Sequence, residues 1–140
     1  MADDDPILTS KSWWDLVDRE HATAKAMVEN REHCAAAWNA TGRAVEFALK
    51  GLIMARENLS AWPDRKQRPD LHTHDIRTLM SAAGIELKNC PPPPRQMLRT
   101  VMDWSREHDY RHGVMPRKVA RDMVNSAFGS EGVVQWLKNQ

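Results

Sequence analysis

The sequence shows no long apolar run, and its first residues do not have the pattern of an export signal. No stretch of its 140 residues approaches the roughly 18 to 20 continuous apolar residues that a membrane-spanning helix needs. The first ten residues, MADDDPILTS, are acidic where a secretory signal would be basic and then apolar. We therefore expect a cytoplasmic protein with no membrane partner.

Cysteine is also scarce. Only Cys34 and Cys90 occur, and they fall in different predicted elements. Two cysteines can form one disulfide, but a chain without an export signal usually keeps its thiols reduced. We therefore expect both thiols to be free.

Length and composition fit one domain. A chain of 140 residues with 41% hydrophobic and 28% charged residues has the size and composition to build one compact core. We assign residues 1–11 to a flexible acidic N-terminus and residues 12–140 to a single helical domain. The sequence contains no internal repeat.

Charge is unevenly distributed along the chain, although the net charge is only +1. Residues 1–30 carry three Lys or Arg against seven Asp or Glu, whereas residues 91–140 carry eight against five. Thirteen of the twenty basic residues are arginine, whose planar guanidinium suits phosphate. The C-terminal part therefore fits contact with a polyanion such as RNA, although a solvated helix surface has the same composition.

Apolar residues recur at helical spacing, and no segment shows the alternation typical of a strand. Gly84 is placed to end the third helix, and Gly129 and Gly132 interrupt the fifth. We predict Ser12, Thr73 and Ser130 as helix N-caps. The result is an all-α, up-and-down bundle of about five helices, at about residues 12–30, 33–57, 74–83, 94–110 and from Pro116 to about 137.

The second predicted helix contains the segment AVEFALKGLIM, in which only Glu46 and Lys50 are charged. Helical spacing places Arg43, Glu46, Lys50 and Glu57 on one narrow stripe, with apolar residues on the other faces. We expect that stripe to be exposed and the rest of the helix to be buried. Since a small domain rarely surrounds one helix, we expect a second subunit to cover part of it, giving a homodimer.

The segment SAWPDRKQRPDL, residues 60–71, reads as a long exposed loop because it contains two prolines and several charges. We expect it to be mobile, with few buried contacts, and loops of this length are often functional. Trp62 is an aromatic residue in a basic loop and is a candidate for stacking on a base. His72 and His74 follow the loop. In place of a binding role, they can have a structural one, in the loop and at the start of the third helix. Candidate nucleic-acid or partner-binding residues are Trp62, Arg65, Lys66, Arg68, His72 and His74.

The order of features resembles the HEPN family. A long helix ending in AVEFALKGLIM precedes a loop, then HTHDIRTLMSAAGI, a proline-marked break, HDYRHG and a helix ending VVQWLKN. The resemblance covers roughly residues 13 to 138, and its most specific part is the pairing of EFALKGL with THDIRTLMSAAGI. It implies a helical bundle that usually dimerises, a frequent partnership with small nucleotidyltransferases and, in many members, metal-independent RNA cleavage.

The family's nuclease signature is an arginine, four to six residues and a histidine, often within His-x-Tyr in toxin members. The segment REHDYRH, residues 106–112, occupies the corresponding place and contains His108-Asp109-Tyr110. Histidine moves protons near neutral pH, and arginine stabilises phosphate charge without a metal. The chain departs from the signature at Asp103, where an arginine would stand five residues before His108. The resemblance therefore marks as candidate catalytic residues Arg106, His108, Tyr110, Arg111 and His112.

Neither a metal nor another cofactor is expected. His108 and His112 are four residues apart and would share a helical face, but no third ligand lies nearby in the sequence. In toxin-type relatives, a tyrosine placed like Tyr110 receives nucleotides from the partner nucleotidyltransferase, which acts as the antitoxin.

Three functions remain open from the sequence. The first is a non-catalytic HEPN module that binds a nucleotide or a partner protein and is associated with a nucleotidyltransferase. The second is a metal-independent ribonuclease toxin or defence effector that uses residues 106–112. The third is an unrelated helical scaffold.

Overall fold

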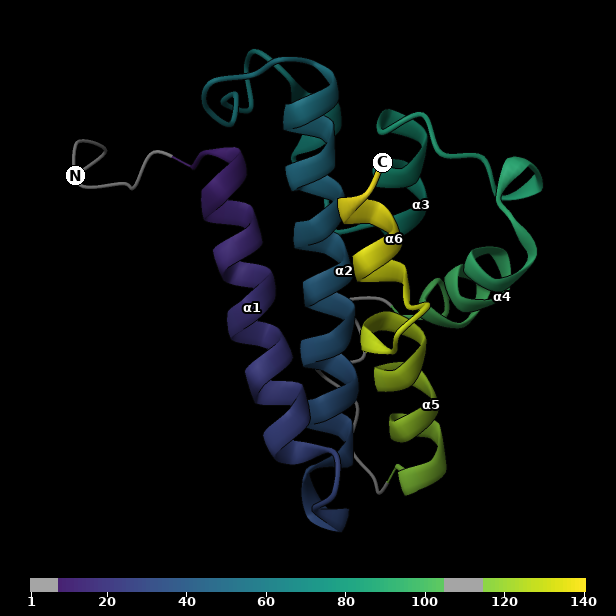
Figure 1. Ribbon diagram of the computed structural model, residues 1–140. Coiled ribbons are helices and arrows are strands. Elements are labelled where there is room, and N and C mark those ends of the chain that lie inside the picture. Colours follow the sequence, from purple (N-terminus) through teal and green to yellow (C-terminus); the bar gives the residue numbers. More distant parts are fainter. Residues whose placement is uncertain (1–7, 105–114) are drawn as a thin grey trace, which may run out of the picture.

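The computed structural model describes residues 8–104 and 115–140, which contain α-helices and no strand. The predicted all-α bundle is confirmed (Figure 1). The helices are α1 (Ser10–Met27), α2 (Cys34–Arg56), α3 (Ile76–Ala82), α4 (Pro92–Val101), α5 (Arg117–Phe128) and α6 (Val133–Lys138).

The first helix begins earlier than predicted, because Thr9 rather than Ser12 is its N-cap. The Thr9 hydroxyl accepts a hydrogen bond from the Ser12 backbone N–H at 3.2 Å, and the Ser12 hydroxyl accepts one from the Thr9 N–H at 3.0 Å. These reciprocal bonds satisfy two backbone donors that a helix start leaves free. Residues 10 and 11 therefore belong to α1 and not to a flexible terminus.

Helix α2 forms the centre of the bundle. Helix α1 lies along one side of it, and α5 and α6 pack on another, with α3 against its C-terminal half (Figure 1). Trp104 packs directly on Gly42, where a Cβ added to the glycine would lie only 2.0 Å from the indole ring. A single chain thus surrounds most of α2, and no second subunit is needed to cover it.

The exposed stripe predicted on α2 is wrong for most of its length. Glu46 has no exposed surface and Lys50 is 6% exposed. Arg43 is half-buried and reaches Glu20 of α1 at 3.5 Å, so only Glu57 at the end of the helix is exposed. The prediction failed because α1 and the segment before α3 pack over this face as well.

The loop after α2 has more buried contacts than predicted. Leu71 is fully buried and Trp62 is half-buried against the core. The Trp62 backbone N–H donates to the Leu8 carbonyl at 2.7 Å, which ties the loop to the chain before α1. Helix α3 then starts with Asp75 as its cap rather than Thr73. Gly84 ends it at a φ of 76°, as predicted from its position.

The proline run contributes to α4 rather than forming only a spacer. Pro91 is extended, and Pro92, Pro93 and Pro94 form the first turn, where the missing N–H costs no hydrogen bond. The predicted break near Gly129 separates α5 from α6. The N-cap of α6 is Gly132 and not the predicted Ser130.

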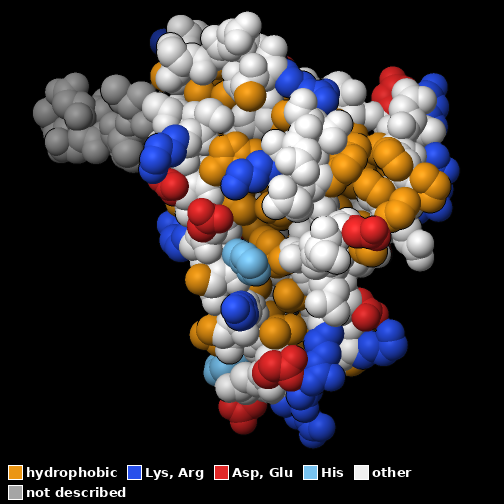
Figure 2. Space-filling model, in the orientation of Figure 1, with side chains coloured by type: hydrophobic (Ala, Val, Ile, Leu, Met, Phe, Trp, Pro, Cys, Tyr) orange, Lys and Arg blue, Asp and Glu red, His pale blue; other side chains and the backbone are white. Residues whose placement is uncertain are grey.

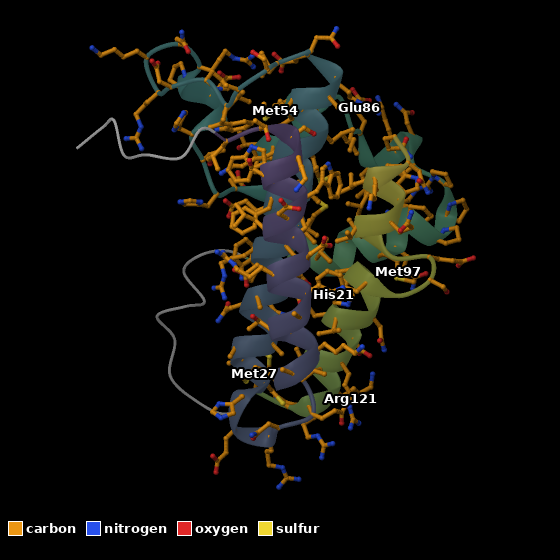
Figure 3. All side chains as sticks on the ribbon, turned by 60° about the vertical axis from the view of Figure 1, so that its left-hand side comes forward. His21, Met27, Met54, Glu86, Met97 and Arg121 are labelled. Atoms are coloured by element: carbon orange, nitrogen blue, oxygen red, sulfur yellow. The ribbon has the colours of Figure 1, made fainter. Side chains whose placement is uncertain are left out.

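The C-terminal helices are tied to α1 by rings and charges. His21 of α1 stacks on Phe128 of α5 with ring centroids 4.0 Å apart. Glu29, just after α1, pairs with Arg117 and Arg121 of α5. Figure 3 shows His21 midway along the bundle and Arg121 toward the end that holds Met27.

Cys34 and Cys90 are both free and buried, as expected for reduced thiols. Burial raises the pKa of the Cys90 thiol. Within the described ranges, none of the helices combines the length and apolar composition needed to cross a bilayer.

Candidate functional site

A buried ion pair lies at the middle of α2. Lys50 Nζ is 3.0 Å from Glu46 Oε2, and the two side chains are 7% and 0% exposed. They are one helical turn apart, so both project to the same face. Charges are expensive to bury, and such pairs are retained only where close geometry offsets the loss of water. The pair therefore marks this face of α2 as a candidate functional site.

His74 connects this buried pair to the surface. Its Nδ1 lies 3.0 Å from Glu46 Oε2, while 58% of its side chain is exposed. An ionised carboxylate only accepts hydrogen bonds, so we assign the donated proton to Nδ1 of the imidazole. In the neutral ring, Nε2 then carries a lone pair. A buried carboxylate that fixes the tautomer of an exposed histidine is the arrangement that catalytic histidines use.

Two tryptophans enclose the Lys50 ammonium. Lys50 Nζ lies 5.1 Å from the Trp13 ring centroid and 5.7 Å from that of Trp62. The two indoles pack edge to face at 5.1 Å. Aromatic faces attract a cation and exclude water from it. Trp62 therefore has a packing role, and base stacking by Trp62 stays a prediction.

Two other candidate binding residues, Arg68 in the loop and His72 directly after it, make contacts within the protein. Arg68 pairs with Asp70 and Glu57, and hydrogen bonds to these carboxylates raise the pKa of the guanidinium. His72 Nε2 lies 2.8 Å from the Pro63 carbonyl oxygen and holds the loop against the segment before α3. This is the structural alternative that the sequence left open for His72.

Arg65 and Lys66 are exposed, and neither has an ion-pair partner within residues 8–104 and 115–140. Because His72 anchors Pro63, the loop that carries these two cations lies beside the segment that carries His74. His74 thus follows the anchoring His72 by two residues, and Arg65 and Lys66 follow the anchored Pro63 by two and three.

The candidate catalytic segment lies outside the described residues, so the structure does not place Arg106, His108, Tyr110, Arg111 or His112. Its N-terminal flank is fixed: Trp104 is buried and its indole Nε1 donates to Asn39 Oδ1 of α2 at 3.0 Å. Trp104 also packs on Gly42, one helical turn before Glu46.

Within the described ranges, no group of three or more histidine, cysteine or acidic residues is placed to hold a metal ion. Comparisons with protein-family models, with curated proteins and with solved structures found no match.

Sequence reasoning included His74 but missed its partner Glu46 and the Lys50 that pairs with Glu46. The signal was available, because a Glu and a Lys four residues apart were the only charges in an otherwise apolar helical segment. Their spacing alone predicts an exposed pair, since exposed pairs of this kind are far more common than buried ones.

Proposed function

We propose that this chain is a HEPN-like helical module that binds a nucleotide, free or within RNA, at His74 and the neighbouring basic loop, and that it works with a nucleotidyltransferase. The observation that carries the binding site is the hydrogen bond between exposed His74 and buried Glu46. The family assignment rests on the sequence resemblance, and the all-α bundle is compatible with it.

Charge at the site favours an anionic ligand. Lys50 compensates the buried Glu46 carboxylate, so Glu46 can orient His74 without presenting a net negative charge. Arg65 and Lys66 add two exposed cations on the adjacent loop. A phosphate group can accept hydrogen bonds from a protonated imidazole and from these side chains. The site therefore fits a phosphate group, and these residues do not require the ligand to have an apolar part.

Binding is supported better than catalysis by the described residues. His74 is one proton-transferring group, whereas cleavage of a phosphodiester needs a general base, a general acid and a cation near the phosphorus. Arg68 is already paired with two carboxylates. The remaining groups would have to come from Arg106, His108, Arg111 or His112.

Metal-independent RNA cleavage is the second candidate function, and the Glu46–His74 pair favours it. A carboxylate-oriented imidazole can remove the proton of a ribose 2′-hydroxyl near neutral pH. In this case residues 106–112 would supply the cation and the general acid, which would make the protein a ribonuclease toxin or defence effector.

The binding experiment compares wild type with His74→Ala and, as a matched control, His33→Ala, which removes another exposed histidine. Titrations would use a labelled single-stranded RNA octamer and ATP at low salt. We expect His74→Ala to weaken binding about 10-fold, the typical effect of losing one charge-assisted hydrogen bond, with no change for His33→Ala. Equal affinities for all three proteins would contradict the proposed site.

The cleavage experiment uses the same RNA at pH 7 with EDTA. If the second function holds, wild type cuts, and His74→Ala, His108→Ala or His112→Ala lowers the rate about 10²- to 10⁴-fold for each essential proton-transfer group. If wild type binds the RNA without cutting it, the first function, a non-catalytic binding module, holds. Cutting that all three variants retain would exclude these histidines as catalytic groups.

A further inference from the structure

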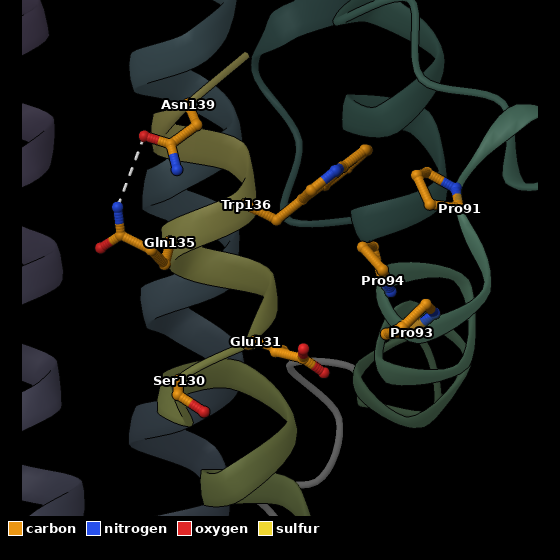
Figure 4. A pocket seen from close by; sticks show the side chains of 9 residues that line it. Pro91, Pro93, Pro94, Ser130, Glu131, Gln135, Trp136 and Asn139 are labelled. Carbon is orange, nitrogen blue, oxygen red and sulfur yellow. Dashed lines mark hydrogen bonds between the residues drawn. The ribbon is translucent and has the colours of Figure 1, made fainter.

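A second candidate binding surface lies between α4 and α6, away from the His74 site. A cavity of about 310 Å³ opens between the proline run and the last helix. Figure 4 shows the Trp136 ring projecting from α6 toward Pro91 and Pro94, with Glu131 near Pro93. In Figure 2, hydrophobic side chains gather at the right of the view, on the side of α4 and α6.

The walls of this cavity are mainly apolar, although Ser130, Glu131, Gln135 and Asn139 also line it. Proline rings fix the backbone φ on one side, and the half-buried indole of Trp136 packs against the core on the other. A rigid site loses little conformational freedom when a ligand binds. The volume lies at the small end of the roughly 300–1,000 Å³ range of ligand pockets, so it suits a short stretch of a longer ligand.

The polar groups of the cavity indicate the chemistry of that ligand. Among its described lining residues, Glu131 is the only charged one, which favours a cation and disfavours a nucleotide phosphate. The Trp136 indole N–H has no acceptor among residues 8–104 and 115–140, so it is available to donate to a ligand carbonyl. The site thus offers a flat apolar face, the indole donor of Trp136 and one negative charge, beside the polar side chains of Ser130, Gln135 and Asn139.

Polyproline II helices match all three properties. They present proline rings to aromatic faces, and their backbone carbonyls have no internal hydrogen bonds and can accept from an indole N–H. An α-helical ligand would leave the indole donor unused, because most of its carbonyls are already bonded. Strand addition needs an exposed sheet edge, and the described residues form no sheet.

We propose that the cavity between Trp136 and Pro91–Pro94 is a docking site for a proline-rich segment of a partner protein, with an adjacent Arg or Lys that pairs with Glu131. The prolines of a second copy of this chain are not this segment, since three of the four are already in α4. The proposal is independent of nucleotide binding at His74.

The test is a titration of the full-length protein with an acetylated peptide of eight prolines followed by two arginines. Binding would be followed by the NMR signal of the Trp136 indole N–H, assigned by its loss in Trp136→Phe. We expect that signal to shift saturably, with a Kd below about 1 mM. Absence of a shift would overturn the proposal.

Variants separate the three contributions. Trp136→Ala should weaken binding about 10-fold or more, and Trp136→Phe, which keeps a ring but loses the donor, about 3- to 10-fold, both followed by calorimetry. The matched control is Leu16→Ala, which removes another half-buried apolar side chain packed on the same core. Unchanged affinity in Trp136→Ala, or an equal loss in Leu16→Ala, would exclude this cavity.

The role of Glu131 is tested by charge reversal. Glu131→Lys should weaken binding of the arginine-tailed peptide and strengthen binding of a matched peptide that ends in two glutamates. Glu32→Lys, at a remote exposed position, should change neither affinity. A helical peptide of the same charge that binds more tightly than the proline peptide would assign the surface to a helix instead and contradict the proposal. Failure of this test would leave the His74 experiments unaffected.

Discussion

At the scale of single residues, the central feature is the burial of Lys50 and Glu46. Lys50 lies between two indoles and 3.0 Å from the Glu46 carboxylate, which in turn holds His74. Removal of one member of a buried pair is much more harmful than loss of an exposed pair, because the remaining charge stays in a poorly solvated site. The chain contains both kinds of pair.

We predict that Lys50→Met destabilises the protein by about 3 to 5 kcal/mol in urea unfolding. Methionine keeps much of the volume against Trp13 and Trp62 but removes the ammonium from the Glu46 carboxylate. The matched control is Lys11→Met, which breaks the exposed Lys11–Asp15 pair at the same four-residue spacing. Similar, small changes for both variants would show that the buried pair contributes little.

At the scale of the elements, the sequence was sufficient where local chemistry decides. The break around Gly129, the turn at Gly84 and the start after Pro116 were predicted because glycine adopts backbone conformations that other residues avoid, whereas proline fixes φ and lacks an N–H. The first cap was misplaced by three residues, since Thr9 and Ser12 are both good caps and form one capping box.

The sequence was insufficient where packing decides. Which face of α2 is covered depends on the positions of α1, α3 and the loop, and four-residue spacing alone does not carry that information. For the same reason His74 was recognised as a candidate while its buried partner Glu46 was not. The residues 106–112, chosen by resemblance, lie outside the described ranges and stay predictions.

Contact between α2 and Trp104 leads to a second prediction. Gly42→Ala places a methyl group against the indole, so we expect a loss of about 1 to 3 kcal/mol from overpacking. Displacement of the ring would also strain its hydrogen bond to Asn39. Thermal unfolding measures the effect, with Ala36→Ser on the exposed face of α2 as the control. A Gly42→Ala protein as stable as wild type would contradict the packing.

The link between α1 and α5 predicts a pH dependence. Hydrogen bonds from Arg121 and Arg117 lower the pKa of Glu29 to about 2 from its ordinary value of 4.5. Because the folded state holds the lower pKa, the stabilisation is present above about pH 4.5 and is lost as the pH falls toward about 2.

We therefore expect Glu29→Gln to lower the melting temperature slightly at pH 7, since the pair is exposed, and the difference from wild type to shrink as the pH falls from 4.5 to 2. Melting curves followed by circular dichroism across this range provide the measurement. A difference that grows with acidification would have the wrong sign for this ion pair.

At the scale of the whole molecule, the chain offers two separate surfaces: the His74 region beside α2 and α3, and the cavity between α4 and α6. Their chemistries differ, because the first presents an imidazole and cations whereas the second presents an indole and a carboxylate. A module that works with a nucleotidyltransferase would use the two surfaces for different ligands.

The homodimer remains a prediction at this scale. Burial of α2 within one chain removes the first reason for it, and the HEPN resemblance is the reason that remains. Sedimentation velocity at micromolar concentration should give a species of twice the 16.0 kDa chain mass. A single species of 16.0 kDa would contradict the dimer without affecting either binding surface.

The central claim is that buried Glu46 orients exposed His74 to contact a nucleotide phosphate. It is tested most directly by ¹⁵N NMR of the imidazole nitrogens, with His74 assigned by its absence in His74→Ala, before and after addition of the RNA octamer. We predict that the neutral ring carries its proton on Nδ1 and that the His74 Nε2 signal shifts on RNA binding, while that of His33 does not. A neutral ring that carries its proton on Nε2 in the free protein, or a His74 signal that saturating RNA leaves unchanged, would contradict the account.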